Sequence, residues 1–280
     1  MHDYTFRIVN VFAQAPLAGN ALAVFEDARG LDAATMQALA LQFNLSETTF
    51  VLPSDAATRR VRIFTPTFEM PFAGHPTLGT AHVVRDVANA GDRVTLEMRA
   101  GVIPVRADAD TWTLSANAPR HRSPSASRAE LASMLGLSVD DLDASAAPLW
   151  VDTGSEQLLV PLASFAAVRR AKPSAAALLA HGNNGGRAMA YVFAREDEHV
   201  LARFFFPKYG AVIEDPGTGS ACANLGGYLL ATGAPLPQRL VIDQGEAVGR
   251  PCRLGLVVDT DRSIQVSGRV VEIGRGTVSL

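Results

Sequence analysis

Short segments rich in β-branched and aromatic residues recur along the whole chain and predict a largely β protein. In one of them, Val61 and Ile63 alternate with Arg62 and Phe64, as the two faces of a pleated strand require. The other predicted strands cover residues 4–12, 48–52, 94–98, 102–107, 188–194, 201–206, 240–243 and 263–270. Strands are therefore expected to form most of the fold.

Helical periodicity is rarer than strand patterning. Asp32 is a suitable N-cap for a helix in which Met36, Leu39, Ala40 and Phe43 follow the i, i+3, i+4, i+7 spacing of one buried face. The spacing predicts one amphipathic helix here.

Two further helices, at about 76–88 and 220–232, are small or apolar on nearly every side, which is typical of helices enclosed within a fold. Proline suits the first helical position, so Pro76 would place His75 at the cap of the first of them. Gly233 is suited to end the second.

The surroundings of these two helices repeat. Each follows a glycine- and proline-rich loop and a strand of the pattern Arg-x-Phe-x-Pro, at 62–66 and at 203–207. Although short strand motifs can coincide by chance, the matching order favours a duplicated unit that curls a sheet around its helix. Prolines and serines in the segment 118–127 mark the boundary, which predicts lobes at 1–118 and 119–269.

Composition excludes several classes of protein. The net charge of −3 argues against nucleic acid as a partner, and no apolar run reaches the ~18 residues that a membrane span needs. The start of the chain has no signal-peptide pattern, and two cysteines are too few for a disulfide scaffold. The six histidines lack metal-ligand spacing. We expect a soluble cytoplasmic protein that binds neither nucleic acid nor a membrane.

The loops that lead into the two apolar helices, at 73–77 and 215–220, are candidate anion sites. A helix N-terminus presents unpaired N–H groups and a partial positive charge, which favour carboxylates and phosphates. The loops lack the lysine of a P-loop and the third glycine of a dinucleotide motif, so a nucleotide is not expected. The alternative is that glycine and proline only turn the chain here.

Glu47 is a candidate for proton transfer. It lies close to Leu45, Phe50 and Val51, and a partly desolvated carboxyl is suited to general acid/base chemistry near neutral pH. The alternative is a glutamate in a surface turn.

Taken together, four motifs resemble the PhzF-like phenazine-biosynthesis proteins. They are Asn-Leu-Ser-Glu-Thr-Thr-Phe at 44–50, Arg-Ile-Phe-Thr-Pro at 62–66, Pro-Phe-Ala-Gly-His-Pro-Thr-Leu-Gly-Thr at 71–80 and Asp-Pro-Gly-Thr-Gly-Ser at 215–220. With the opening strand, the resemblance extends from residue 4 to about 230.

The resemblance implies a diaminopimelate-epimerase-like α+β fold. In this fold two pseudo-symmetric lobes each form a mainly antiparallel β-barrel around a central helix, with the active site between them. It also implies that a C-terminal strand at about 270–280 returns to the first lobe.

For function, the resemblance implies a cofactor-free, homodimeric isomerase that acts on a small carboxylate substrate of the 2,3-dihydro-3-hydroxyanthranilate type. By this similarity Glu47 would be the general acid/base, and His75 and Asp215 would position the substrate and stabilise charge. The Gly74 amide, and those of Gly219 and Ser220, would hold its carboxylate.

Two alternatives remain open. A cofactor-independent epimerase or racemase of the same fold would use a thiol at each helix start. Gly74, His75 and Pro216 occupy those positions here, and Cys222 falls inside the second helix, where a core role is expected. A non-catalytic carboxylate-binding protein would not need Glu47, so that residue favours an enzyme.

Overall fold

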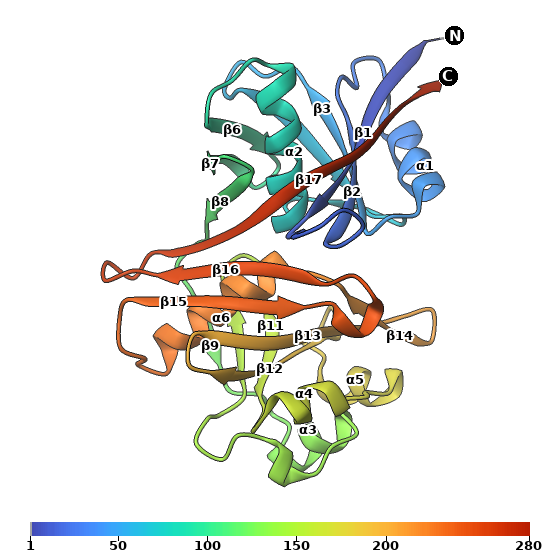
Figure 1. Ribbon diagram of the computed structural model, residues 1–280. Helices are drawn as coiled ribbons and strands as arrows, with labels where there is room; N and C mark the ends of the chain where they lie inside the picture. Colours follow the sequence, from blue (N-terminus) through green and yellow to red (C-terminus); the bar gives the residue numbers. More distant parts are fainter. Residues whose placement is uncertain (1) are drawn as a thin grey trace. The chain divides into compact units, whose positions relative to one another are not determined.

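The computed structural model describes residues 2–280, which form an α+β fold of two compact units (Figure 1). Of the described residues, unit 1 comprises 2–115 and 267–280, and unit 2 comprises Ala116–Val266. Within the described range, no helix has both the length and the apolar character that crossing a membrane requires.

Unit 1 is a closed barrel of eight strands, with a two-residue strand β5 (Glu69–Met70) attached to β4. The strand β17 closes the barrel because it pairs with both β1 and β8. The pairs β2–β3 and β4–β6 are parallel, whereas β1–β17, β1–β2, β3–β4, β6–β7 and β7–β8 are antiparallel. The eight strands are β1 (Asp3–Val11), β2 (Asn20–Phe25), β3 (Glu47–Leu52), β4 (Arg59–Phe64), β6 (Arg93–Met98), β7 (Gly101–Asp108), β8 (Thr111–Ser115) and β17 (Ile264–Ser279).

The helix α2 (Gly74–Val87) is enclosed by this barrel and contacts β1, β2, β3, β6, β7 and β8. Every residue from Gly74 to Val84 is buried, which confirms the prediction of an apolar helix inside the fold. The predicted start was wrong: Ala73 is the N-cap and His75 is the second helical residue. First-turn N–H groups have no partner within a helix, so Pro76 fits the third position as well as the first.

The amphipathic helix predicted after Asp32 is confirmed as α1 (Ala33–Phe43). The Asp32 carboxylate accepts a hydrogen bond from the Thr35 amide at 2.8 Å, and Met36, Leu39 and Ala40 are buried. This face packs over an aromatic cluster in which Phe25 and Phe50 are stacked with their ring centroids 4.9 Å apart. The helix α1 therefore covers β3 and β4 on the side of the sheet away from α2.

One buried arginine connects several elements of unit 1. The Arg7 side chain, on β1, is only 6% exposed. It donates hydrogen bonds to Glu26 at 2.5 Å, to Asp86 of α2 at 2.8 Å and to Glu272 of β17 at 3.0 Å. Burial alone would lower the pKa of Arg7, but the three carboxylates raise it above its ordinary value. The ion pairs hold β17 against the rest of the barrel.

Unit 2 wraps its sheet around the helix α6 (Gly219–Ala231), which contacts β9, β10, β11 and β16. Gly219 and the residues from Ala221 to Leu230 are buried, as predicted for this helix, and Gly233 follows its end with φ +74°. The strands are β9 (Arg120–Arg122), β10 (Leu149–Asp152), β11 (Gln157–Pro161), β12 (Ala190–Glu196), β13 (His199–Lys208), β14 (Ala211–Asp215), β15 (Gln238–Gln244) and β16 (Cys252–Val258).

The strand pairings of the two units repeat in the same order. In unit 1, β1–β2 is antiparallel, β2–β3 parallel, β3–β4 antiparallel, β4–β6 parallel and β6–β7 antiparallel. In unit 2, the pairs β10–β11, β11–β12, β12–β13, β13–β15 and β15–β16 have the same succession of directions. The predicted duplication is thus confirmed, and β10–β16 are the counterparts of β1–β7.

The repeated Arg-x-Phe-x-Pro motif makes the same contact in each unit. Arg62 donates two hydrogen bonds of 2.8 Å to Glu69 of the short strand β5. Arg203 binds Glu214 of β14 in the same way, with its shortest hydrogen bond at 2.7 Å. Each guanidinium also lies over the aromatic ring two residues further on, at 5.0 and 4.7 Å from the ring centroid.

Unit 2 also contains three short helices that the sequence analysis did not predict. Their buried residues form a separate hydrophobic core with β10–β13. Each begins after a serine whose hydroxyl accepts a helix N–H. They are α3 (Arg128–Met134), α4 (Phe165–Arg170) and α5 (Ala175–His181).

Candidate active site

Glu47 and His75 meet at one end of the unit 1 barrel. Glu47 is the first residue of β3, where it pairs with Leu22 of the parallel strand β2. Its Oε2 lies 3.3 Å from Nε2 of His75, and the two side chains are 15% and 6% exposed. Glu47 is therefore a half-buried carboxyl in contact with a buried imidazole rather than a surface-turn residue.

His75 is neutral in this setting. Burial lowers its pKa to about 3, and a hydrogen bond with the Ala21 backbone offsets only part of this shift. Its Nδ1 lies 3.4 Å from Nδ2 of Asn20, the first residue of β2. A neutral imidazole carries a single N–H, so the contact with Glu47 is an arrangement for one shared proton and not a salt bridge.

The chemistry of this pair follows from its burial. Within residues 2–280 the buried Nε2 of His75 makes no well-aligned hydrogen bond, although it faces the carboxyl of Glu47. At 3.3 Å from Oε2, this nitrogen can share one proton with the Glu47 carboxyl. The Glu47 carboxyl beside it can accept and return a proton.

The two central helices begin at equivalent positions in the two units. Gly74 is the first residue of α2 and Gly219 the first of α6, with Ser220 second. Neither N-cap, Ala73 or Thr218, satisfies first-turn amides with a side-chain hydrogen bond. Both helix starts therefore retain N–H groups that can bind an oxyanion.

Asp215 ends β14 and is held by a small hydrogen-bond network. Its Oδ2 accepts a hydrogen bond from the Thr218 hydroxyl, and its carbonyl accepts one from Nε2 of Gln244 at 2.8 Å. Oε1 of Gln244 accepts the Thr218 amide at 3.3 Å. The buried Gln244 thus holds the main chain of Asp215 and the turn into α6, and the Thr218 hydroxyl holds the Asp215 carboxylate.

Gly245 allows the chain after β15 to pack closely against the backbone of Pro216 and Arg250. Its φ is +82°, and an added Cβ would lie 2.3 Å from the Arg250 carbonyl oxygen and 2.4 Å from that of Pro216. Gly245→Ala should therefore cost about 2–3 kcal/mol of stability, measured by denaturant unfolding. Gly249→Ala is the matched control, because φ is +68° there but no atom lies within 4 Å of the new Cβ. Equal losses in both variants would contradict the proposed clash.

Neither cysteine thiol is suited to act as an acid or base in the site. Cys222 and Cys252 are free and buried, and burial raises the pKa of both thiols well above the ordinary value. The expected core role of Cys222 is confirmed. Over the described part of the chain, no group of three or more histidine, cysteine, aspartate or glutamate side chains could hold a metal ion.

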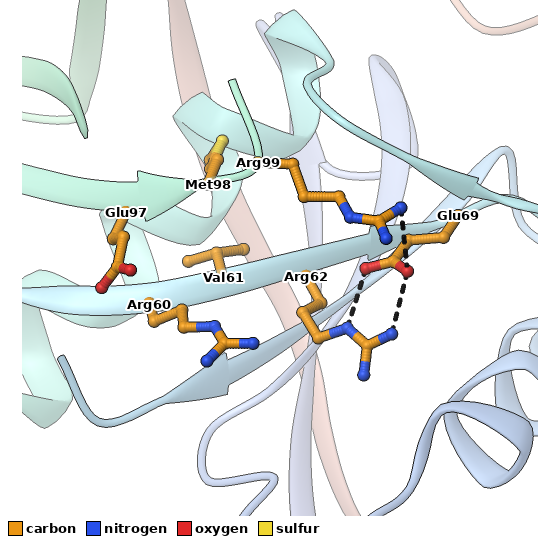
Figure 2. Close-up of a pocket in the computed structure, with 7 residues that line it drawn as sticks. All are labelled: Arg60, Val61, Arg62, Glu69, Glu97, Met98 and Arg99. Carbon is orange, nitrogen blue, oxygen red and sulfur yellow. Dashed lines mark hydrogen bonds and ion pairs between the residues drawn. The ribbon is translucent and has the colours of Figure 1, made fainter. Parts of the chain in front are cut away.

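A surface pocket of about 420 Å³ lies elsewhere on unit 1 and contains none of the predicted site residues. Figure 2 shows Arg62 and Arg99 converging on Glu69 within it. Glu69 already pairs with Arg62 and Arg99, and Glu97 accepts a hydrogen bond from Ser54, so the pocket resembles a surface ion-pair network more than a substrate site. Its lining residues are Arg60, Val61, Arg62, Glu69, Glu97, Met98 and Arg99.

The structure thus brings Glu47 together with His75 in unit 1, and Asp215 together with the loop that leads to Gly219 and Ser220 in unit 2. That both helix starts face a single cleft stays a prediction. Three buried amides that contact these residues were not among the predicted site residues. They are Asn20, Gln157 and Gln244, which contact His75, Ser220 and the 215–218 loop.

The chain resembles known proteins over nearly its whole length. The family model of the phenazine biosynthesis-like proteins (PhzC-PhzF) matches residues 9–276. An uncharacterized isomerase of Pasteurella multocida is 39% identical, with 98% of this chain and 93% of that protein covered. The trans-2,3-dihydro-3-hydroxyanthranilate isomerase of Pseudomonas chlororaphis is 36% identical over all of both chains.

Solved structures agree with the fold. A PhzF-family phenazine biosynthesis protein from Bacillus anthracis superimposes with a TM-score of 0.89 at 27% identity, over the full length of both chains. A hydroxyproline epimerase from Agrobacterium vitis gives a TM-score of 0.65 at 13% identity, covering 99% of this chain and 93% of that one. The second likeness shows the epimerase-like fold alone. The chain belongs to the phenazine biosynthesis-like family, and it is an enzyme of the isomerase class.

Proposed function

We propose that this isomerase moves a proton between ring carbons of a small cyclic amino acid of the trans-2,3-dihydro-3-hydroxyanthranilate type, with Glu47 as the general acid/base. The contact that carries the proposal is the 3.3 Å approach of the half-buried Glu47 carboxyl to the buried, neutral His75. The Pseudomonas relative supplies the substrate class.

In this proposal Glu47 removes a proton from one ring carbon and delivers it to another. The electron pair of the broken C–H bond shifts through the ring double bonds to the carbon that is reprotonated, so no atom or electron is gained or lost. His75 orients the Glu47 carboxyl and contributes a polar ring nitrogen to the hydroxyl or amine of the substrate. Because His75 stays neutral at physiological pH, it adds no charge that would trap the carboxyl in its ionised form.

The other predicted residues bind the substrate. The Asp215 carboxylate accepts a hydrogen bond from the amine, a role for which the Thr218 hydroxyl holds it in place. The amides at Gly74, Gly219 and Ser220 hold the carboxylate by the partial positive charge of a helix start. We propose that the enzyme works as a cytoplasmic homodimer and without a cofactor, since a proton shift needs neither oxidant nor reductant.

Turnover in D₂O by chelator-treated enzyme tests the function. A single carboxyl that moves a proton while partly open to water should exchange some of it, so the product should carry deuterium at the reprotonated carbon. Activity should be unchanged after chelation. A loss of activity that added metal restores, or dependence on a nicotinamide or flavin, would contradict the proton-transfer mechanism.

A further inference from the structure

The duplication sets a side-chain amide against the second residue of each central helix. Asn20 begins β2 and Gln157 begins β11, and these strands are counterparts in the two units. Nδ2 of Asn20 lies 3.4 Å from Nδ1 of His75, and Nε2 of Gln157 lies 2.9 Å from Oγ of Ser220. The second helical residue is thus held by an amide in both units.

In unit 2 the orientation of this amide is fixed by backbone groups. The Thr153 N–H, which can only donate, bonds to Oδ1 of the fully buried Asn224 at 2.9 Å. Nδ2 of Asn224 must then be the amide nitrogen, and it donates to the Ser155 carbonyl and to Oε1 of Gln157, both at 2.8 Å. Oxygen and nitrogen of both amides are thereby assigned without ambiguity.

The orientation of the Gln157 amide determines how the Ser220 hydroxyl is hydrogen-bonded. Since the oxygen of Gln157 faces Asn224, its nitrogen faces Ser220 and donates to Oγ. Gln157 is 4% exposed and cannot turn without breaking the bond to Asn224. Within the described residues the Ser220 hydroxyl accepts this bond and donates none, so its own proton remains available to a ligand.

We propose that Gln157 is a positioning residue that makes the Ser220 hydroxyl a hydrogen-bond donor, and that unit 2 thereby selects an anionic oxygen over an N–H group in the substrate. This inference rests on the proposed function, in which Ser220 lies against the substrate carboxylate. The Ser220 hydroxyl proton is then the group that distinguishes a carboxylate from the isosteric carboxamide.

The test compares the affinities of 3-hydroxyanthranilate and its carboxamide by calorimetry. The wild-type protein should prefer the carboxylate, and Gln157→Met, which removes the donor without adding charge, should reduce that preference about tenfold. Gln157→Glu, which accepts the Ser220 proton, should reduce it further. Gln37→Met is the control, because Gln37 donates to the Thr65 carbonyl in unit 1 and should leave the preference unchanged.

A second variant separates positioning from a general structural effect. In a Ser220→Ala background, Gln157→Met should produce no further change in the ratio of the two affinities. The inference would be overturned by an unchanged ratio in Gln157→Met, or by an equal change with and without Ser220. Binding that follows these expectations in a protein that does not isomerise the dihydro compound would contradict the proposed function alone.

Discussion

Replacing Glu47 by glutamine should lower kcat/KM about 10²–10⁴-fold while leaving the fold intact. Glutamine preserves the shape of the side chain and its contact with His75, but it cannot take a proton from carbon or return one. The substrate is trans-2,3-dihydro-3-hydroxyanthranilate, followed by its change in absorbance, with thermal unfolding measured on the same samples.

Glu97→Gln provides a matched control for this variant. Glu97 is another partly buried carboxyl of unit 1, on β6, where it accepts a hydrogen bond from Ser54 at 2.5 Å. Its replacement should leave turnover near the wild-type level. Near-wild-type activity in Glu47→Gln would remove Glu47 from the mechanism.

The largest expected loss of stability comes from Arg7→Met. The variant would leave Glu26, Asp86 and Glu272 near one another without their shared cation. Breaking a buried ion pair costs about 3–5 kcal/mol, and we expect about 3 kcal/mol because the carboxylates are partly exposed. Denaturant unfolding at pH 7 measures the loss. Arg29→Met, which removes an exposed arginine paired with Asp27, should leave the unfolding midpoint unchanged.

The pH dependence of this loss identifies its cause. Burial would raise the pKa of Glu272, but hydrogen bonds from Arg275 and Arg7 outweigh it and lower the pKa. A lowered carboxyl pKa stabilises the fold above about pH 4.5, the unfolded value, and this contribution is lost as the pH falls further. Without Arg7 the carboxylates repel, so the stability gap between wild type and variant should narrow as the pH falls from 7 to 4. A gap that stays constant would point to lost packing instead of charge.

Much of the fold could be predicted from sequence because its strongest signals are local. The cap at Asp32 and the spacing of Met36, Leu39 and Ala40 were sufficient for α1. The two enclosed helices were evident from the lack of any polar face. The short helices α3–α5 were not predictable in this way, since six or seven residues are too few to establish a period and only their serine caps mark them.

The site was predictable only in part. Motif resemblance predicts Glu47, His75, Asp215 and Ser220 as site residues, but the residues that contact them are far away in sequence. Gln157 is 63 residues from Ser220, and Gln244 is 29 residues from Asp215. An amide at a strand end has no local pattern that names its partner, so only the register of β2 and β11 reveals that Asn20 and Gln157 are counterparts.

The return of β17 to the first barrel has a consequence for biosynthesis. Residues 3–115 provide seven of the eight barrel strands and all of α2. The barrel nevertheless stays open between β1 and β8 until residues 267–279 emerge from the ribosome. Residues 116–266 are complete before that point. The unit that is synthesised first is therefore the one that finishes folding last, and until then its apolar interior and open strand edges are prone to aggregation.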